Sequence, residues 1–413
     1  MTQATPCFPA FRARLAALGR HTAGTLRQAT LGQLQQHLRN LLPAPLLSAT
    51  DQGPNSRQRV GSGGQLQGRP VKVVDASTTQ LPDTQKNQKR YPQSGAQKPG
   101  CGFPILKFMV LFSLCSGAVL NVLFGNLHDH DLRLLHGLWE VLKRGDILLG
   151  DRAFGECTTL AALPQGLGVD VVARLHARRK ADFRKAQRLA KHDGLFVWHK
   201  GYQQSEILSA TQWALLPAPI TVRLLRFTAT IRGFRSRRVT LVTSLLDSKL
   251  YPAQDLIALY ARRWRLELCL RDLKTTMGME QLRCQSPDMA QKELLAYLVA
   301  HNLVRCLIAE SLATYQVDME RVSFKGSMDA LRQYSNAIAQ ARSQTMRDQL
   351  WQDLLLNLAR DLVPHRPGRQ EPRAVKRRPK PYPLLNRPRH RFRQASHRNR
   401  YRKNNPRNYR GLN

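Results

Sequence analysis

The segment from Tyr260 to Lys274, YARRWRLELCLRDLK, carries side chains whose types and spacing suit phosphate chemistry. On a helix that turns about 100° per residue, Tyr260, Arg263, Glu267 and Lys274 fall within an arc of about 60°. A carboxylate flanked by two cations and a phenol suits a metal-bridged phosphate, because the acid holds the ion and the others hold phosphate oxygens. The same pattern is typical of a solvated helix surface, in which charges four residues apart pair with one another.

Two aspartates elsewhere each follow an apolar run that we interpret as a β-strand. Asp75 follows VKVV and Asp151 follows DILLG. An acid in that position is often only a helix cap or a turn residue. Together with Glu267, however, these aspartates make up the three carboxylates that two-metal phosphoryl transfer needs, with Mg²⁺ ions about 3.5–4 Å apart.

Other acidic and histidine residues fit this chemistry less well. Asp272 lies about 140° from Glu267 around the helix, so we expect it to point elsewhere. His128 and His130 flank Asp129 with metal-like spacing, but the segment looks like a loop that enters a helix, with Asp129 as its cap.

The elements that would position the three acids follow in a recognisable order. We predict the strand Val71–Val74, the hairpin Ile105–Phe124, a helix from Asp129 to Lys143, the strand Ile147–Gly150, a helix from Cys157 and the strand Val169–Leu175. This is the order of an RNase H-like α/β fold, whose mixed sheet brings acids from distant positions together. Further helices are expected from about Pro252, at Met289–Ala313 and at Ser327–Ala359.

Composition shifts divide the chain into six regions. They are a helical N-terminal region at 1–50, a linker at 51–70, a first core part at 71–175, a β-rich basic insertion at 176–238, a second core part with helices at 239–360, and a disordered basic tail at 361–413. For the N-terminal region, which includes a predicted helix at 11–20, a DNA-binding module and a packing subdomain are both open.

The charge balance indicates an acidic partner. The 413 residues carry a formal net charge of +37, which destabilises a compact state unless a polyanion binds. Nucleic acid is the first choice and an anionic membrane surface the second. The apolar run Phe108–Phe124 is shorter than the roughly 20 residues of a spanning helix, so we interpret it as two strands joined at Ser116 and Gly117.

Cysteine usage and the first residues indicate the compartment. The seven cysteines form no C-x-x-C pair, so we expect neither a zinc site nor a disulfide framework. The first residues lack the apolar block of a signal peptide, and we expect a cytoplasmic protein.

The motifs around the three acids resemble a known family. The spacing Tyr-x2-Arg-x3-Glu-x6-Lys is similar to the signature of DDE transposases of the insertion-sequence-four type, and Tyr260, Arg263, Glu267 and Lys274 meet it without a gap. Val71–Thr79 resembles the first aspartate box of that family, and Gly150–Phe154 resembles the second, G-D-R-x-[FY]. The likeness covers roughly Val71 to Glu310.

The resemblance implies roles for these residues. Asp75, Asp151 and Glu267 would be catalytic ligands of two Mg²⁺ ions, with Mn²⁺ as a possible substitute. Tyr260, Arg263 and Lys274 would bind DNA phosphates. The implied partners are the terminal repeats of an insertion element and its target DNA, bound by a dimer at the bacterial nucleoid.

Three alternatives stay open at this point. A nuclease on the same fold would cut without strand transfer. A transposase-derived DNA-binding protein would lack catalysis, although clustered carboxylates do not help a protein that binds a polyanion. A basic membrane-surface protein would leave the acids unexplained.

The C-terminal tail generates a test of its own. Residues Arg366–Asn413 hold seventeen Lys and Arg residues and a single acid, Glu371. Because each neutralised phosphate releases counterions, we expect deletion of Arg366–Asn413 to flatten the slope of log affinity against log salt. A titration of duplex DNA binding at several salt concentrations measures this, and an unchanged slope would refute a phosphate-anchoring tail.

Overall fold

The computed structural model describes most of the chain between Thr30 and Pro364. The described ranges are 30–41, 64–201, 208–229, 237–318 and 321–364, together with residue 391. The predicted helix at 11–20, most of the predicted linker and nearly all of the basic tail lie outside these residues.

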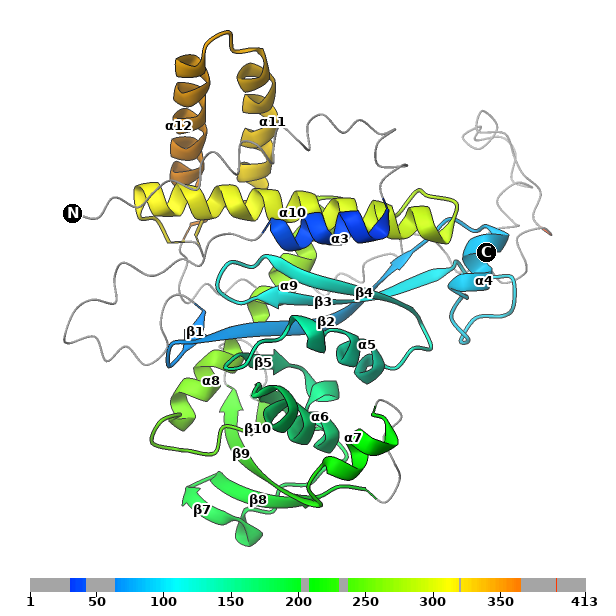
Figure 1. Ribbon diagram of the computed structural model, residues 1–413, viewed down its shortest axis with the longest axis vertical. Coiled ribbons are helices and arrows are strands. Elements are labelled where there is room, and N and C mark those ends of the chain that lie inside the picture. The colour runs from blue at the N-terminus through cyan, green and yellow to red at the C-terminus, as the bar shows by residue number, and fades with distance from the viewer. Residues whose placement is uncertain are drawn as a thin grey trace, which may run out of the picture.

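A single mixed sheet of ten strands forms the centre of the described protein (Figure 1). Its order is β4-β3-β2-β5-β6-β10-β9-β8-β7, with β1 paired to β2. The pairs β2–β5 and β5–β6 are parallel, whereas the other described pairs are antiparallel, so the predicted mixed sheet is confirmed. The strands are β1 Gln65–Leu66, β2 Arg69–Gln80, β3 Ile105–Ser113, β4 Val119–Asn126, β5 Ile147–Gly150, β6 Asp170–Arg174, β7 Gln187–Ala190, β8 Asp193–His199, β9 Pro219–Ala229 and β10 Arg237–Thr243.

Helices flank this sheet, and a helical hairpin projects from the long helix α10 (Figure 1). The helices are α3 Leu31–Asn40, α4 Gln85–Arg90, α5 Asp131–Gly137, α6 Cys157–Ala162, α7 Ala210–Leu215, α8 Ala253–Ala261, α9 Trp264–Arg271, α10 Pro287–Tyr315, α11 Phe324–Gln340 and α12 Gln344–Arg360. Short helical turns occur at η1 Trp139–Val141, η2 Arg152–Phe154, η3 Leu163–Leu167, η4 Phe183–Lys185 and η5 Asp272–Thr276.

Two apolar clusters cover the two faces of the sheet. Val71 and Val73 of β2 belong to one cluster with residues of α3, α8, α9 and α10. Val74, the residue between Val73 and Asp75, belongs to the other cluster with residues of α5 and α6. Successive residues of a strand point to opposite faces, so this alternation tells which way each side chain of β2 points.

The apolar run proposed as a hairpin forms β3 and β4. Phe108 pairs with Phe124 across the two antiparallel strands, and Gly117 takes a left-handed φ of +67° in the connection. The membrane reading of this run is therefore wrong. Among the described helices, α10 has the length and composition to cross a membrane, but 61% of its apolar window is buried inside the protein, as in a core helix.

Several predicted boundaries were wrong. The strand that was expected to end at Val74 continues as β2 to Gln80, because β3 pairs with every residue from Lys72 to Gln80. The helix expected from Asp129 to Lys143 is the shorter α5 followed by η1. The single helix expected at Ser327–Ala359 is two, α11 and α12, since the Ser343 hydroxyl accepts the Met346 N–H and caps a new helix.

The basic insertion does not form a separate body of strands. Its strands β7, β8 and β9 pair in turn and join β10, which pairs with β6 of the central sheet. The sheet therefore continues past the acids into the insertion (Figure 1).

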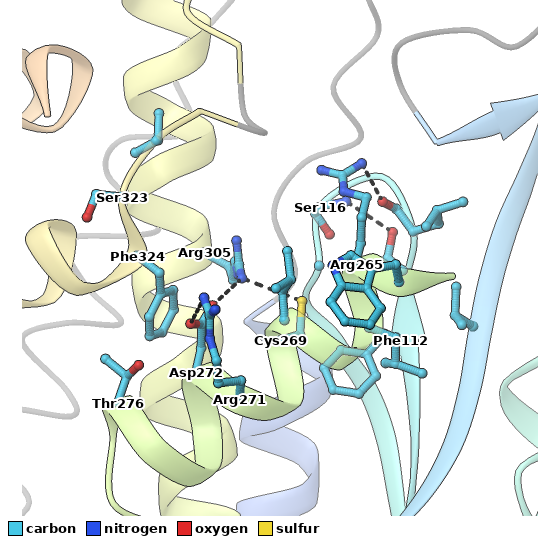
Figure 2. Close-up of a pocket in the computed structure, with 18 of the residues that line it drawn as sticks. Phe112, Ser116, Arg265, Cys269, Arg271, Asp272, Thr276, Arg305, Ser323 and Phe324 are labelled. Atoms are coloured by element: carbon cyan, nitrogen blue, oxygen red, sulfur yellow. Dashed lines mark hydrogen bonds and ion pairs between the residues drawn. The ribbon is translucent and has the colours of Figure 1, made fainter. Parts of the chain in front are cut away.

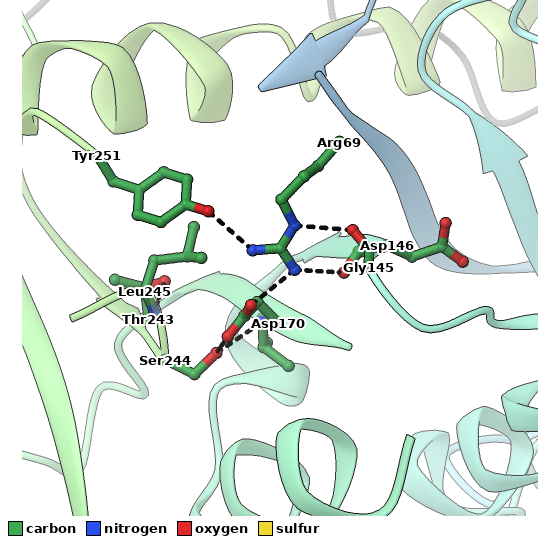
Figure 3. Close-up of polar contacts among 9 residues, drawn as sticks. Arg69, Gly145, Asp146, Asp170, Thr243, Ser244, Leu245 and Tyr251 are labelled. Carbon is green, nitrogen blue, oxygen red and sulfur yellow. Dashed lines mark hydrogen bonds and ion pairs between the residues drawn. The ribbon is translucent and has the colours of Figure 1, made fainter. Parts of the chain in front are cut away.

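Arg69 ties the beginnings of the three parallel strands together (Figure 3). Its guanidinium donates to the carbonyl oxygens of Gly145 and Asp146, just before β5, and forms a 2.7 Å ion pair with Asp170 at the start of β6. It also donates to the Tyr251 hydroxyl, close before α8. One side chain of β2 thus contacts the residues just before β5 and the start of β6, the strand beyond it, which stabilises the relative register of the three parallel strands.

The N-terminal helix α3 packs on the body of the protein. Leu34 and Leu38 are buried in the same cluster as α10, and Asn302 of α10 donates to the Leu38 carbonyl. A DNA-binding role for residues 1–50 stays a prediction.

Candidate active site

The register of β2 and β5 brings Asp75 beside Asp151. Val73 is the register partner of Leu149 in the parallel pair, so two residues further along Asp75 lies opposite Asp151. Val73 and Leu149 belong to the same core cluster. Because side chains alternate along a strand, both aspartates point to the face that carries helices α8 and α9.

The strand β5 ends at Gly150, and Asp151 follows it directly. A Cβ on Gly150 would lie 2.7 Å from the Phe154 ring, so the close approach of this ring requires glycine at position 150. Asp151 itself keeps an extended backbone with φ −83° and ψ −168°. The Gly150–Phe154 box therefore places its acid at the open end of the strand.

The helix that carries Glu267 is not continuous, contrary to the prediction. Arg262 and Arg263 form a tight turn between α8 and α9, in which the amide of Arg263 donates to the carbonyl of Tyr260. Bonds between residues three apart make side chains eclipse, so Tyr260 and Arg263 stack on one side. The guanidinium of Arg263 lies 5.9 Å from the Tyr260 ring.

The structure brings the six predicted site residues together. The Tyr260 hydroxyl donates to Asp151 Oδ1 over 3.5 Å, and Arg263 pairs with Glu267 at 2.9 Å. Asp75 lies within electrostatic range of both other acids and of Arg263. Lys274, in the π-helical turn η5, lies within range of Asp75.

Burial dominates the electrostatics of this cluster. It raises the pKa of Asp75 to about 6, against the Ala76 amide and Arg263, and the charges of Asp151 and Glu267 add to the increase. Burial also lowers the pKa of Lys274, which Glu280 and Asp75 partly offset. Carboxylates that destabilise one another in this way would gain from a bound cation.

The donor set fits a divalent ion of the hard type. Three carboxylates offer the oxygen ligands that Mg²⁺ prefers. In the described ranges, however, no group of three His, Cys, Asp or Glu residues is arranged as a metal site, and Glu267 is paired with Arg263. In this structure Arg263 thus occupies one of the two carboxylate oxygens of Glu267.

Asp272 points away from these acids, as its helical position predicted. It lies 3.2 Å from Arg305 of α10, in a pocket behind α9 (Figure 2). Arg305 is also within 3.5 Å of the Cys269 sulfur. These contacts fix the rear of α9 to α10 and leave Glu267 on the opposite side.

The two tryptophans of the basic insertion are not on this face. Trp198 of β8 and Trp213 of α7 pack against the cluster that contains Val74, on the far side of the sheet. Arg179 lies 4.1 Å above the Trp198 ring. Their surroundings are those of packed side chains.

Arg174 lies beside these acids, although no motif in the sequence indicated it. Ala173 is the register partner of Gly150. One residue further along both strands, Arg174 therefore lies beside Asp151. Val172, two residues before Arg174 and therefore on the same face of the strand, belongs to the same cluster as Val73 and Leu149. A basic residue near the end of the predicted strand Val169–Leu175 was the available signal.

Comparisons with known proteins agree with these motifs. Residues 66–303 match the family described as transposase DDE domain. The chain is 28% identical over 321 residues to the transposase InsG for insertion sequence element IS4 of Escherichia coli K12, which covers 75% of this chain and 68% of that protein. It is 34% identical over 74 residues to the transposase for insertion sequence element IS421 of Escherichia coli, which covers 18% and 20% of the two chains.

One solved structure is similar in part. The piggyBac transposase in a synaptic complex with hairpin DNA aligns with 73% of this chain and 59% of its own, at 10% identity and a TM-score of 0.41.

The short separation of the three carboxylates leads to a prediction about the free energy of unfolding. In buffer with a chelator, we expect Asp75→Asn to raise the free energy of unfolding by about 1–2 kcal/mol, because it removes a buried charge that two carboxylates repel. Urea unfolding measures the difference. Asp353→Asn on the exposed side of α12 is the control and should change stability by less than about 0.5 kcal/mol.

Added Mg²⁺ should stabilise the parent protein and leave Asp75→Asn nearly unchanged, since the ion needs the carboxylate. A variant that is less stable than the parent in chelator would contradict this account of the cluster.

Proposed function

Because this chain belongs to the DDE transposase family, and is thus an enzyme that acts on DNA, we propose that it cleaves insertion-element ends with metal ions and joins them to target DNA. The observation that supports this is the convergence of Asp75, Asp151 and Glu267. Two come from neighbouring parallel strands and the third from a helix packed on the same face. The basic residues of the signature share that face.

The acids have the role of metal ligands in this proposal. Asp75, Asp151 and Glu267 would hold two Mg²⁺ ions, for which Mn²⁺ can substitute. Bound there, such ions activate the attacking oxygen and neutralise charge on the leaving oxygen. Burial of Asp75 keeps water away from the cluster and strengthens its hold on a cation.

The cations and the phenol have the role of phosphate ligands. Arg263 and Lys274 would pair with phosphate oxygens of the element end, and the Tyr260 hydroxyl would donate to another. Arg263 changes partner in this scheme, from the Glu267 carboxylate to a phosphate. With its side chain 19% exposed and that of Glu267 39% exposed, the bridge is worth no more than about 1 kcal/mol and opens readily.

The reaction has two phosphoryl transfers. In the first, a water oxygen attacks the phosphorus at the element end and the 3′-oxygen leaves with a proton. In the second, the freed 3′-OH attacks a target phosphodiester in line and loses its proton, while the target 3′-oxygen leaves. Both steps use the same acids.

Family membership indicates DNA as the partner. We further propose that the terminal repeats and the target are both bound as duplexes, that two copies of the chain hold two ends in the synaptic complex, and that the reaction takes place at the nucleoid in the cytoplasm.

Removing one acid should separate binding from cleavage. We expect Glu267→Gln to slow end cleavage in Mg²⁺ by about a thousandfold or more, because metal stabilisation of the transition state is worth several kcal/mol. Gel-shift affinity for a duplex with the terminal repeat from the DNA flanking the gene should stay within about threefold.

Asp353→Asn is the matched control, since it makes the same change on an exposed helix. Retained cutting by Glu267→Gln in Mg²⁺ would remove this residue from the active site. Cleavage by the parent without joining to a target plasmid would instead support a nuclease without strand transfer.

The two cations of the signature should stabilise the complex of the protein with paired element ends. We expect Arg263→Ala and Lys274→Ala each to weaken the complex of paired ends by about tenfold to a hundredfold, the effect of one charged hydrogen bond. Native gels with labelled end duplexes measure this. Arg271→Ala is the control, because Arg271 lies on α9 with its side chain 63% exposed beside Asp272. Equal assembly by all three variants would refute the phosphate role.

A further inference from the structure

We propose that Arg174 contacts the phosphodiester that reacts, by donating to a non-bridging oxygen next to Asp151. This inference rests on the proposed function and adds a residue outside the four-residue signature. The contact would hold the phosphate between β6 and the helix pair α8–α9.

The sheet places Arg174 in a row with the two aspartates. The parallel register pairs Gly150 with Ala173, so Asp151 and Arg174 are the next pair along. Asp75 lies on the other side of Asp151 by the β2–β5 register. Neighbouring strands are about 4.8 Å apart, and the row therefore spans about 10 Å on one face.

The Arg174 side chain reaches the site. Tyr260 lies over this row, and burial raises the pKa of its hydroxyl. Arg263 and Arg174 both oppose that increase, whereas Asp151 adds to it. Arg174 thus lies within electrostatic range of the same hydroxyl that donates to Asp151.

Arg174 has no anionic partner in the described part of the chain. The residue is half-buried, and its guanidinium forms no ion pair or hydrogen bond with any residue in the described ranges. By contrast, Arg69, Arg223, Arg263 and Arg305 all pair with an acid. A partly buried cation without a partner is costly, and an incoming anion would remove that cost.

Guanidinium chemistry selects the ligand. Its planar fork of donors matches two oxygens of a phosphate, and its charge persists at every working pH. Carboxylate ligands are already present as Asp75 and Asp151, whose charges repel a phosphodiester. Arg174 provides a positive charge beside them, so the scissile phosphate can lie above the aspartates without an unbalanced repulsion.

The experiment uses full-length protein and end duplexes with the terminal repeat from the DNA flanking the gene. We expect Arg174→Ala to weaken binding in EDTA and to slow cleavage in Mg²⁺ by about tenfold to a hundredfold. Arg174→Lys should recover part of both. A duplex with a neutral methylphosphonate at the element–flank junction removes the contacted charge, so parent and Arg174→Ala should bind it equally within about twofold.

Arg188→Ala is the matched control, because Arg188 is exposed on the edge strand β7. It should bind and cleave both duplexes as the parent does. Arg174→Gln serves as a second variant if Arg174→Ala does not fold, as judged by its melting temperature.

Two results would overturn the inference. An unchanged affinity and rate for Arg174→Ala would show that Arg174 does not touch the phosphate. A loss that persists in full with a methylphosphonate at each phosphate within two nucleotides of the junction would show that Arg174 acts only by positioning Tyr260. Failure of the parent to cleave would count against the proposed function, whereas the binding comparison in EDTA is independent of cleavage.

Discussion

The parallel register of β2, β5 and β6 is the constraint on which the site depends. A shift of one residue between β2 and β5 would turn Asp75 to the other face of the sheet, away from Glu267. Arg69 opposes such a shift from the far end of the strands, where it bonds to the start of β5 and to Asp170 of β6 (Figure 3). The chemistry at one end of the sheet is thus fixed by a polar contact at the other end.

Electrostatic strain is the second feature of the site. Three carboxylates lie on one face, and burial raises the pKa of Asp75. Arg263 pairs with Glu267 at 2.9 Å and also lies within electrostatic range of Asp151. Its guanidinium therefore partly neutralises the carboxylates in the absence of a metal ion. In the proposed function, the pair of Arg263 and Glu267 would open when a metal ion and a phosphate bind.

The sequence predicted that the acids and the signature cations would lie together, since strand-end acids and helical spacing are local patterns; their roles stay predictions. It also predicted the hairpin of β3 and β4 and the mixed sheet. The break at Arg262 and Arg263 was missed because neither proline nor glycine marks it, and tertiary packing forms it. Asp75 was expected at the end of a strand, whereas β2 continues past Asp75 to Gln80 because it pairs there with β3. Arg174 was missed because it lies beside Asp151 only through the register of β5 and β6, and a single sequence does not reveal strand register.

The way in which the insertion joins the sheet has an evolutionary consequence. Strands β7, β8 and β9 add outward from β10, on the side of β6 away from Asp75 and Asp151. Insertions or deletions in those hairpins change the free edge and leave the inner strands untouched. Natural variation can therefore reshape this edge of the protein without a change in the strands that carry Asp75 and Asp151.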